Sequence, residues 1–136
     1  MESILVDTSV WIDWFNEKSN YSPETNLLGT YFTQRVPVYA TPTILQEVLQ
    51  GIRSDKDFRD VREVLLSVPI LLLDPVEAAI EAATLYRSLR QKGVTIRKPN
   101  DCLIAHYAIF YGVPVLHNDI DFDQIARFTT LRIANP

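Results

Sequence analysis

The chain has 136 residues, of which 47% are apolar and 22% are charged, and its net charge is −4. This length predicts one domain, residues 1–136, with enough buried surface to fold without a disulfide. Cys102 is the only cysteine, which is typical of a protein of the reducing cytoplasm. There is no secretory signal and no apolar run of membrane-spanning length, so no membrane location is expected.

The apolar pattern predicts short strands that alternate with helices. In chain order we expect a strand at Ile4–Val6, a helix at Val10–Phe15, a polar turn from Asn16, a helix from Pro23, a strand at Val36–Ala40, a helix from Thr41 to Gly51, a helix at Asp55–Val68, a strand at Ile70–Leu73, a helix at Pro75–Lys92, a helix at Asn100–Tyr111, a strand at Val113–Leu116 and a last strand at Leu131–Ile133. This alternation predicts an α/β fold with a mostly parallel sheet.

Two acidic residues follow predicted strands. Asp7 comes directly after the first strand, and Asp119 comes shortly after the strand at Val113–Leu116. Because the carboxyl ends of parallel strands border one crevice, both side chains are expected at the same rim. Asp7 could also cap the next helix, but Thr8 or Ser9 would do so equally well, which leaves Asp7 for another purpose.

Glu47 and Asp101 are predicted on helices that begin at the same rim. Glu47 lies beside the apolar face in the first half of its helix, and Asp101 lies in a first helical turn. Each has a simpler explanation, because Glu47 could be solvated and Asp101 could be favoured by the helix dipole. Four carboxylates at one rim would repel one another unless a hard cation such as Mg²⁺ or Mn²⁺ joined them.

Four segments carry a family resemblance, and they read ILVDTSVWID, TPTILQEVLQG, KPNDCLIAHYA and VPVLHNDIDFDQIA. In this order they resemble the PIN domain family, and most closely its VapC-type toxins, which are RNA endonucleases of prokaryotic toxin–antitoxin pairs. The resemblance extends from residue 4 to about residue 126. It implies a three-layer α/β/α sandwich around the sheet. It further implies that four acids bind Mg²⁺ or Mn²⁺ and activate water to cut RNA: Asp7, Glu47, Asp101 and Asp119.

The resemblance also implies supporting residues. Thr8 matches a small hydroxyl residue that helps to position a metal-bound water, with a helix cap as the alternative. Asn118 and Asp121 match positions beside the fourth acid that orient water or metal. His117 stands where the family often has Thr or Ser, so a metal ligand, an RNA contact and a substituted neighbour all remain open for it. Asp123 is equally open, since it would lie in the first turn of a short helix ending at Arg127.

One stretch of the chain is clearly basic. Between Thr84 and Asn100 there is no acidic residue, and the stretch carries Arg87, Arg90, Lys92, Arg97 and Lys98. Phosphate contacts supply most of the sequence-independent affinity for nucleic acid, so Arg97 and Lys98 are candidate RNA-binding residues. A solvated helix face is the alternative interpretation.

The resemblance implies a metal-dependent endoribonuclease that is the toxin of a type II toxin–antitoxin pair. It implies RNA as substrate, a cognate antitoxin that occludes the acidic site with a basic side chain, and a homodimer. A catalytically inactive PIN-like module for RNA binding or protein interaction is the alternative, and the presence of all four acids argues against it. A phosphotransferase of the haloacid dehalogenase type is disfavoured because Ser9 stands where it needs a second aspartate.

Overall fold

The computed structural model describes residues 1–16, 18 and 21–136. Its elements are β1 (Ile4–Val6), α1 (Thr8–Phe15), α2 (Pro23–Thr33), β2 (Val38–Tyr39), α3 (Pro42–Gln50), α4 (Asp55–Leu66), α5 (Pro75–Gln91), α6 (Asn100–Tyr111), β3 (Val115–Leu116) and α7 (Ile120–Phe128). The turn predicted to begin at Asn16 falls in part on residues 17, 19 and 20, which lie outside the described residues. Within the described part of the chain, no helix is long and apolar enough to cross a membrane.

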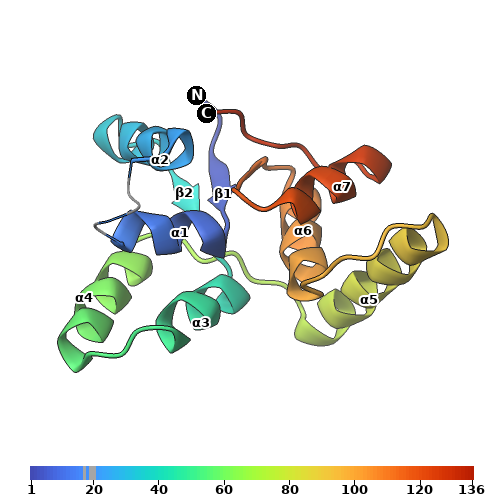
Figure 1. Ribbon diagram of the computed structural model, residues 1–136, viewed down its shortest axis with the longest axis horizontal. Coiled ribbons are helices and arrows are strands. Elements are labelled where there is room, and N and C mark those ends of the chain that lie inside the picture. The colour runs from blue at the N-terminus through green and yellow to red at the C-terminus, as the bar shows by residue number, and fades with distance from the viewer. Residues whose placement is uncertain (17, 19–20) are drawn as a thin grey trace.

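A parallel sheet with the strand order β2–β1–β3 lies at the centre of the fold. Single parallel bridges widen it, from Ala40 to Ile70 on one side and from Val115 to Ile133 on the other. All of β1 is buried, as expected for a strand covered on both faces. Figure 1 shows α1 to α4 on one side of β1 and α5 to α7 on the other. The predicted α/β fold is confirmed.

The strand order creates a crevice at one edge of the sheet. From β1 the chain builds outward through β2 to Ile70, and it then returns to β1 and builds outward through β3 to Ile133. This reversal makes the junction of β1 and β3 a topological switch point, where the carboxyl ends of the strands border a crevice. Asp7 follows β1, and Asp119 is separated from β3 by two residues. The topology therefore directs both acids to one place.

Several strands are shorter than predicted. The strand expected at Val36–Ala40 is reduced to Val38–Tyr39, and the one expected at Val113–Leu116 is reduced to Val115–Leu116. Proline precedes each of these strands, and it has no N–H to donate to the ladder. The segments at Ile70–Leu73 and Leu131–Ile133 contribute single bridges in place of the predicted strands.

Two helices begin earlier than predicted because aspartates cap them. α1 begins at Thr8 and not at Val10, since the Asp7 side chain accepts the N–H of Ser9. Asp7 itself is the cap, so the expectation that Thr8 or Ser9 could cap this helix and leave Asp7 for another purpose is wrong. α7 begins at Ile120, where a short helix from Asp123 was predicted, because Asp119 accepts the N–H of Asp121 in the same way. An aspartate at the end of a strand thus starts the next helix.

Candidate active site

Asp7 has a capping role and still retains one unpaired oxygen. Its Oδ2 accepts the Ser9 N–H at 3.0 Å and the Ser9 hydroxyl at 2.6 Å. Its Oδ1 is buried and has no hydrogen-bond partner among the described residues, and Asp7 is only 4% exposed. Burial raises the pKa of Asp7, although the hydrogen bonds from Ser9 oppose this effect. Because a buried polar atom without a partner is costly, Oδ1 is available to bind a cation.

Asp119 divides its two oxygens in a similar way. Its Oδ1 accepts the Asp121 N–H at 3.0 Å in the helix cap, and its Oδ2 accepts a hydrogen bond from Lys98 Nζ at 3.0 Å. Burial raises the pKa of Asp119, but the hydrogen bonds from Asp121 and Lys98 outweigh it, and the pKa is lowered. Asp121 is held by Arg97, whose backbone N–H donates to its Oδ2 at 3.1 Å.

Asp101 is the acid that the site perturbs most. It lies in the first turn of α6, is 4% exposed, and has a buried Oδ2 without a hydrogen-bond partner in the part of the chain that the structure describes. Burial and then the negative charges of Asp7 and Asp119 raise its pKa to about 8, against a smaller opposing effect of Lys98. At neutral pH and without a cation, Asp101 therefore carries a proton. This is the behaviour expected where several carboxylates share one site.

Glu47 reaches the site by a different route from the one predicted. It lies in the second half of α3 and not toward its start, so the shared rim of strand ends and helix starts does not explain its position. Helix α1 packs against α3, and the Thr8 hydroxyl donates to Glu47 Oε1 at 2.9 Å. Thr8 therefore orients Glu47 and does not cap a helix.

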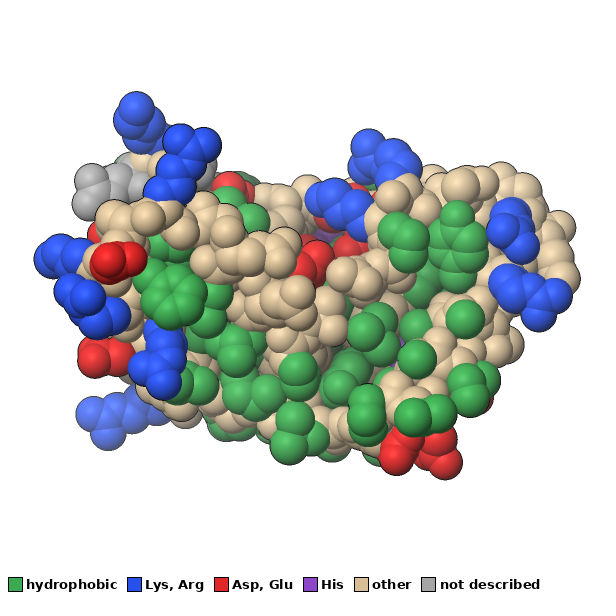
Figure 2. Space-filling view, turned by 90° about the horizontal axis from the view of Figure 1, so that it is seen from below, with side chains coloured by type: hydrophobic (Ala, Val, Ile, Leu, Met, Phe, Trp, Pro, Cys, Tyr) green, Lys and Arg blue, Asp and Glu red, His purple; other side chains and the backbone are tan. Residues whose placement is uncertain are grey.

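The four predicted acids come together in one site. A cavity of about 230 Å³ is lined by Asp7, Thr8, Ser9, Ile12, Glu47, Gln50, Lys98 and Asp101. Ligand oxygens of Asp101, Asp119 and Asp121 also lie within 4.8 Å of one another. Asp101 belongs to both groups and joins them. Figure 2 looks onto this face and shows acidic side chains near its middle, with Lys and Arg side chains beside them.

The donor set fits a hard divalent cation. Capping bonds hold one oxygen of Asp7 and one oxygen of Asp119, which fixes the direction of each carboxylate. The unpaired oxygens of Asp7 and Asp101 are buried and remain available. Mg²⁺ and Mn²⁺ prefer such carboxylate oxygens, together with water.

Two residues that the sequence interpretation missed link the acids to Asn118. The Asn118 N–H donates to the Ser9 hydroxyl at 3.2 Å, and Ser9 in turn donates to Asp7. The Asn118 side-chain amide donates to Asp13 Oδ2. Ser9 and Asp13 are four residues apart, so they share one face of α1, and this spacing was the available signal. The amide of Asn118 is thus directed to Asp13.

The His117 ring accepts a hydrogen bond from the backbone of Asp119. Its Nδ1 accepts the Asp119 N–H at 3.0 Å, so this nitrogen carries no proton. Its Nε2 lies 3.2 Å from Asp123 Oδ1, which is within ion-pair distance but lacks the geometry of a hydrogen bond. The ring is buried and lies 5.1 Å from the Phe122 ring. Because Nδ1 is already an acceptor, it is not available to bind a metal.

The side chains of the two candidate RNA-binding residues, Arg97 and Lys98, contact acidic residues of the site. The Arg97 guanidinium is 3.5 Å from Asp119 Oδ1 and 3.7 Å from Asp121 Oδ1. Lys98 lines the cavity, and its hydrogen bond to Asp119 raises its pKa, with further contributions from the charges of Asp101 and Asp7. Both side chains are more than half exposed. The basic segment that leads into α6 therefore borders the acidic site.

Comparisons with known proteins agree with this architecture. The chain matches the PIN domain over residues 4–128. It is 35% identical to ribonuclease VapC11 of Mycobacterium tuberculosis over 133 residues, which cover 97% of this chain and 98% of the relative. Its fold is similar to DNA-bound VapBC from Salmonella typhimurium, with a TM-score of 0.76, 22% identity and 98% coverage of each chain. VapBC2 from Rickettsia felis, bound to a promoter DNA fragment, gives a TM-score of 0.72 at 18% identity, again with 98% coverage of each chain. The chain belongs to the PIN domain family.

Proposed function

We propose that this chain is a metal-dependent endoribonuclease that hydrolyses RNA phosphodiester bonds and is the toxin of a type II toxin–antitoxin pair. The observation that carries the proposal is the meeting of four acids at one edge of the sheet: Asp7, Glu47, Asp101 and Asp119. Asp7 and Asp101 each have a buried oxygen that lacks a partner among the described residues. The name of the M. tuberculosis relative, a VapC ribonuclease, supports RNA as the substrate. The structural similarity to VapBC proteins, a family of toxin–antitoxin systems, supports a toxin that is paired with an antitoxin.

Mg²⁺ or Mn²⁺ is the proposed cofactor, with Asp7, Asp101 and Asp119 as its main ligands and Asp121 beside them. When bound, such an ion activates water and stabilises negative charge on the phosphate. The chain contributes orientation, because the caps of α1 and α7 fix Asp7 and Asp119, and Thr8 holds Glu47 at the cavity wall. Arg97 and Lys98 border the site and are the proposed contacts to RNA phosphates.

Incubation of the purified protein with a mixed pool of structured RNAs tests this function. We expect cleavage with Mn²⁺ or Mg²⁺ and none in EDTA, because the carboxylates alone supply no Lewis acid. A contaminating ribonuclease of the metal-independent type would cut in EDTA as well, so the chelated sample is the control. If the protein binds RNA but never cuts it with either ion, the inactive RNA-binding module becomes the better description.

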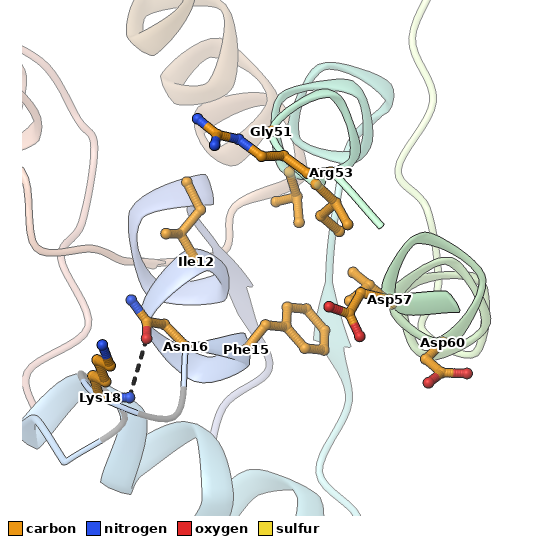
Figure 3. A pocket seen from close by; sticks show the side chains of 11 residues that line it. Ile12, Phe15, Asn16, Lys18, Gly51, Arg53, Asp57 and Asp60 are labelled. Atoms are coloured by element: carbon orange, nitrogen blue, oxygen red, sulfur yellow. Dashed lines mark hydrogen bonds between the residues drawn. The ribbon is translucent and has the colours of Figure 1, made fainter. Parts of the chain in front are cut away.

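The antitoxin is the proposed partner, and a groove beside the site is its proposed binding surface. The groove has a volume of about 780 Å³, and its apolar lining includes Ile12, Phe15 and Val48. Figure 3 shows Ile12 and Phe15 on its α1 side, with Asp57 and Asp60 on its α4 side. Ile12 also lines the acidic cavity, so a peptide in the groove would reach the acids with its next residues.

Replacing Ile12 by Lys is expected to weaken antitoxin binding. Ile12 is 49% exposed, so the fold should tolerate the change, whereas a charge among the apolar side chains of the groove opposes docking. We expect the affinity for the antitoxin encoded by the neighbouring gene to fall about tenfold or more, as for a central interface residue. Calorimetric titration measures this, with Leu66→Lys as the matched control at a position that is 52% exposed. If both variants bound the antitoxin with equal affinity, the antitoxin would bind at a surface other than this groove.

A homodimer stays a prediction. Exposed apolar residues on α5 and α6 form the surface that we propose for it: Val76, Ile80 and Phe110. Sedimentation velocity of the wild-type protein measures the association, and a monomer at micromolar concentration would contradict it. The cytoplasmic location also stays a prediction.

A further inference from the structure

Lys98 occupies an unusual position for a candidate RNA-binding residue. It lies in the segment between α5 and α6, three residues before Asp101, and its ammonium group reaches into the acidic cavity. Nζ donates to Asp119 Oδ2 at 3.0 Å. More than half of the side chain is exposed, so the contact places the charged end at the acids while the stem stays at the surface.

Lys98 contacts the Asp119 oxygen that makes no backbone hydrogen bond. Asp119 Oδ1 accepts the backbone N–H of Asp121 in the cap of α7, so Oδ2 is the oxygen of Asp119 that is not committed to the backbone. The nearby Oδ1 of Asp7 and Oδ2 of Asp101 are buried and accept no hydrogen bond from residues 1–16, 18 or 21–136. These unpaired oxygens indicate a cation site independently of the clustering of acids, and the Lys98 ammonium lies at its border.

We propose that Lys98 is an intramolecular counter-ion that holds the place of the divalent cation and must leave Asp119 when the cation binds. The inference rests on the proposed function, since it concerns the same cation site. Two positive charges that share one carboxylate oxygen repel each other strongly in a site partly shielded from water. Lys98 is therefore a positioning residue that stabilises the metal-free acids and competes with the ion. Its flexible stem lets the ammonium swing outward without a change in the backbone.

Substitution Lys98→Met tests this competition without any measurement of activity. Methionine keeps the apolar stem and removes the charge. We expect the variant to bind Mn²⁺ about 3- to 10-fold more tightly than the wild type, because the ion no longer displaces an ammonium group. In EDTA we expect a lower melting temperature than for the wild type, because the acids lose their counter-ion. Electron paramagnetic resonance of free Mn²⁺ gives the affinity, and thermal unfolding gives the stability.

Lys92→Met is the matched control. It removes the same charge from the same basic stretch, but Lys92 Nζ lies over the Phe128 ring at 5.5 Å and not on the acids. If both variants gained affinity equally, a general change in net charge would explain the result and the proposal would fail. A Lys98→Met variant that binds Mn²⁺ as well as the wild type would show that Lys98 does not compete with the ion, and weaker binding would show that Lys98 supports the site. Either result would overturn the proposal.

The same titration separates this inference from the proposed function. Mn²⁺ binding by the wild type without a gain in Lys98→Met refutes the competition and leaves the metal site intact. Absence of Mn²⁺ binding in both proteins refutes the metal site and the competition together. Binding by Lys98→Met alone supports both proposals, because the ammonium would then block the ion fully in the wild type.

Discussion

Asp7→Asn is expected to lower metal-dependent RNA cleavage on the order of 10²–10³-fold or more while the protein stays folded. The substitution replaces a charged ligand oxygen at the unpaired Oδ1 or at the capping Oδ2 by an amide nitrogen. Asparagine is as good a helix cap as aspartate, so α1 should still begin at Thr8. RNA cleavage with Mn²⁺ and circular dichroism of the same samples measure the two effects.

The stability of this variant carries a second expectation. Burial raises the pKa of Asp7, so the ionised side chain destabilises the metal-free fold at pH values above its ordinary pKa. The metal-free variant should therefore melt at the same temperature as the wild type or higher, by about 3–5 °C for each 1 kcal/mol gained. Asp60→Asn is the matched control, because Asp60 pairs with Lys56 on the surface of α4. If Asp7→Asn cleaved RNA at the wild-type rate, Asp7 would not belong to the active site. A lower melting temperature would show that the substitution damaged the fold.

Mn²⁺ binding is expected to strengthen with pH, by up to about tenfold per pH unit between roughly pH 6 and pH 8. The pKa of Asp101 is raised to about 8, mainly by burial and then by Asp7 and Asp119. Below this value the folded, metal-free protein keeps a proton on Asp101, and the ion must displace it. Calorimetric titrations in buffers of different ionisation enthalpy measure both the affinity and the proton released. An affinity that does not change over this range would contradict the assignment.

Asp101→Asn provides the control for this pH dependence. In the unfolded chain Asp101 loses its proton near the ordinary value of 3.8, whereas the folded chain keeps it until about pH 8. Between these values the unfolded state binds fewer protons, so this group lowers the free energy of unfolding as the pH rises. Without metal, the variant should be more stable than the wild type at pH 8 and no more stable at pH 4. Its weaker Mn²⁺ binding should also lose the proton release.

Much of the site follows from short-range patterns in the chain. A buried parallel strand that ends at Asp7 directs this residue to the carboxyl edge of the sheet, and the same reasoning applies to Asp119 after β3. Asp101 needs only its place in the first turn of α6. The strand ends were overestimated because apolar residues around Pro37, Pro69 and Pro114 continue the hydrophobic pattern, although proline interrupts the hydrogen-bonded ladder.

The sequence by itself determined the residue types and the local geometry: an acid after a strand, an acid in a first helical turn, and the caps that follow. The tertiary structure alone decided which of these groups touch. Thr8 and Glu47 are 39 residues apart, and Asn118 and Ser9 are 109 apart, yet each pair shares a hydrogen bond. The charge of Lys98 makes it a candidate RNA-binding residue, and only the folded chain brings its ammonium group onto Asp119. The physical reason is that hydrophobic periodicity specifies which face of an element is buried, whereas contacts between polar side chains depend on how those elements pack.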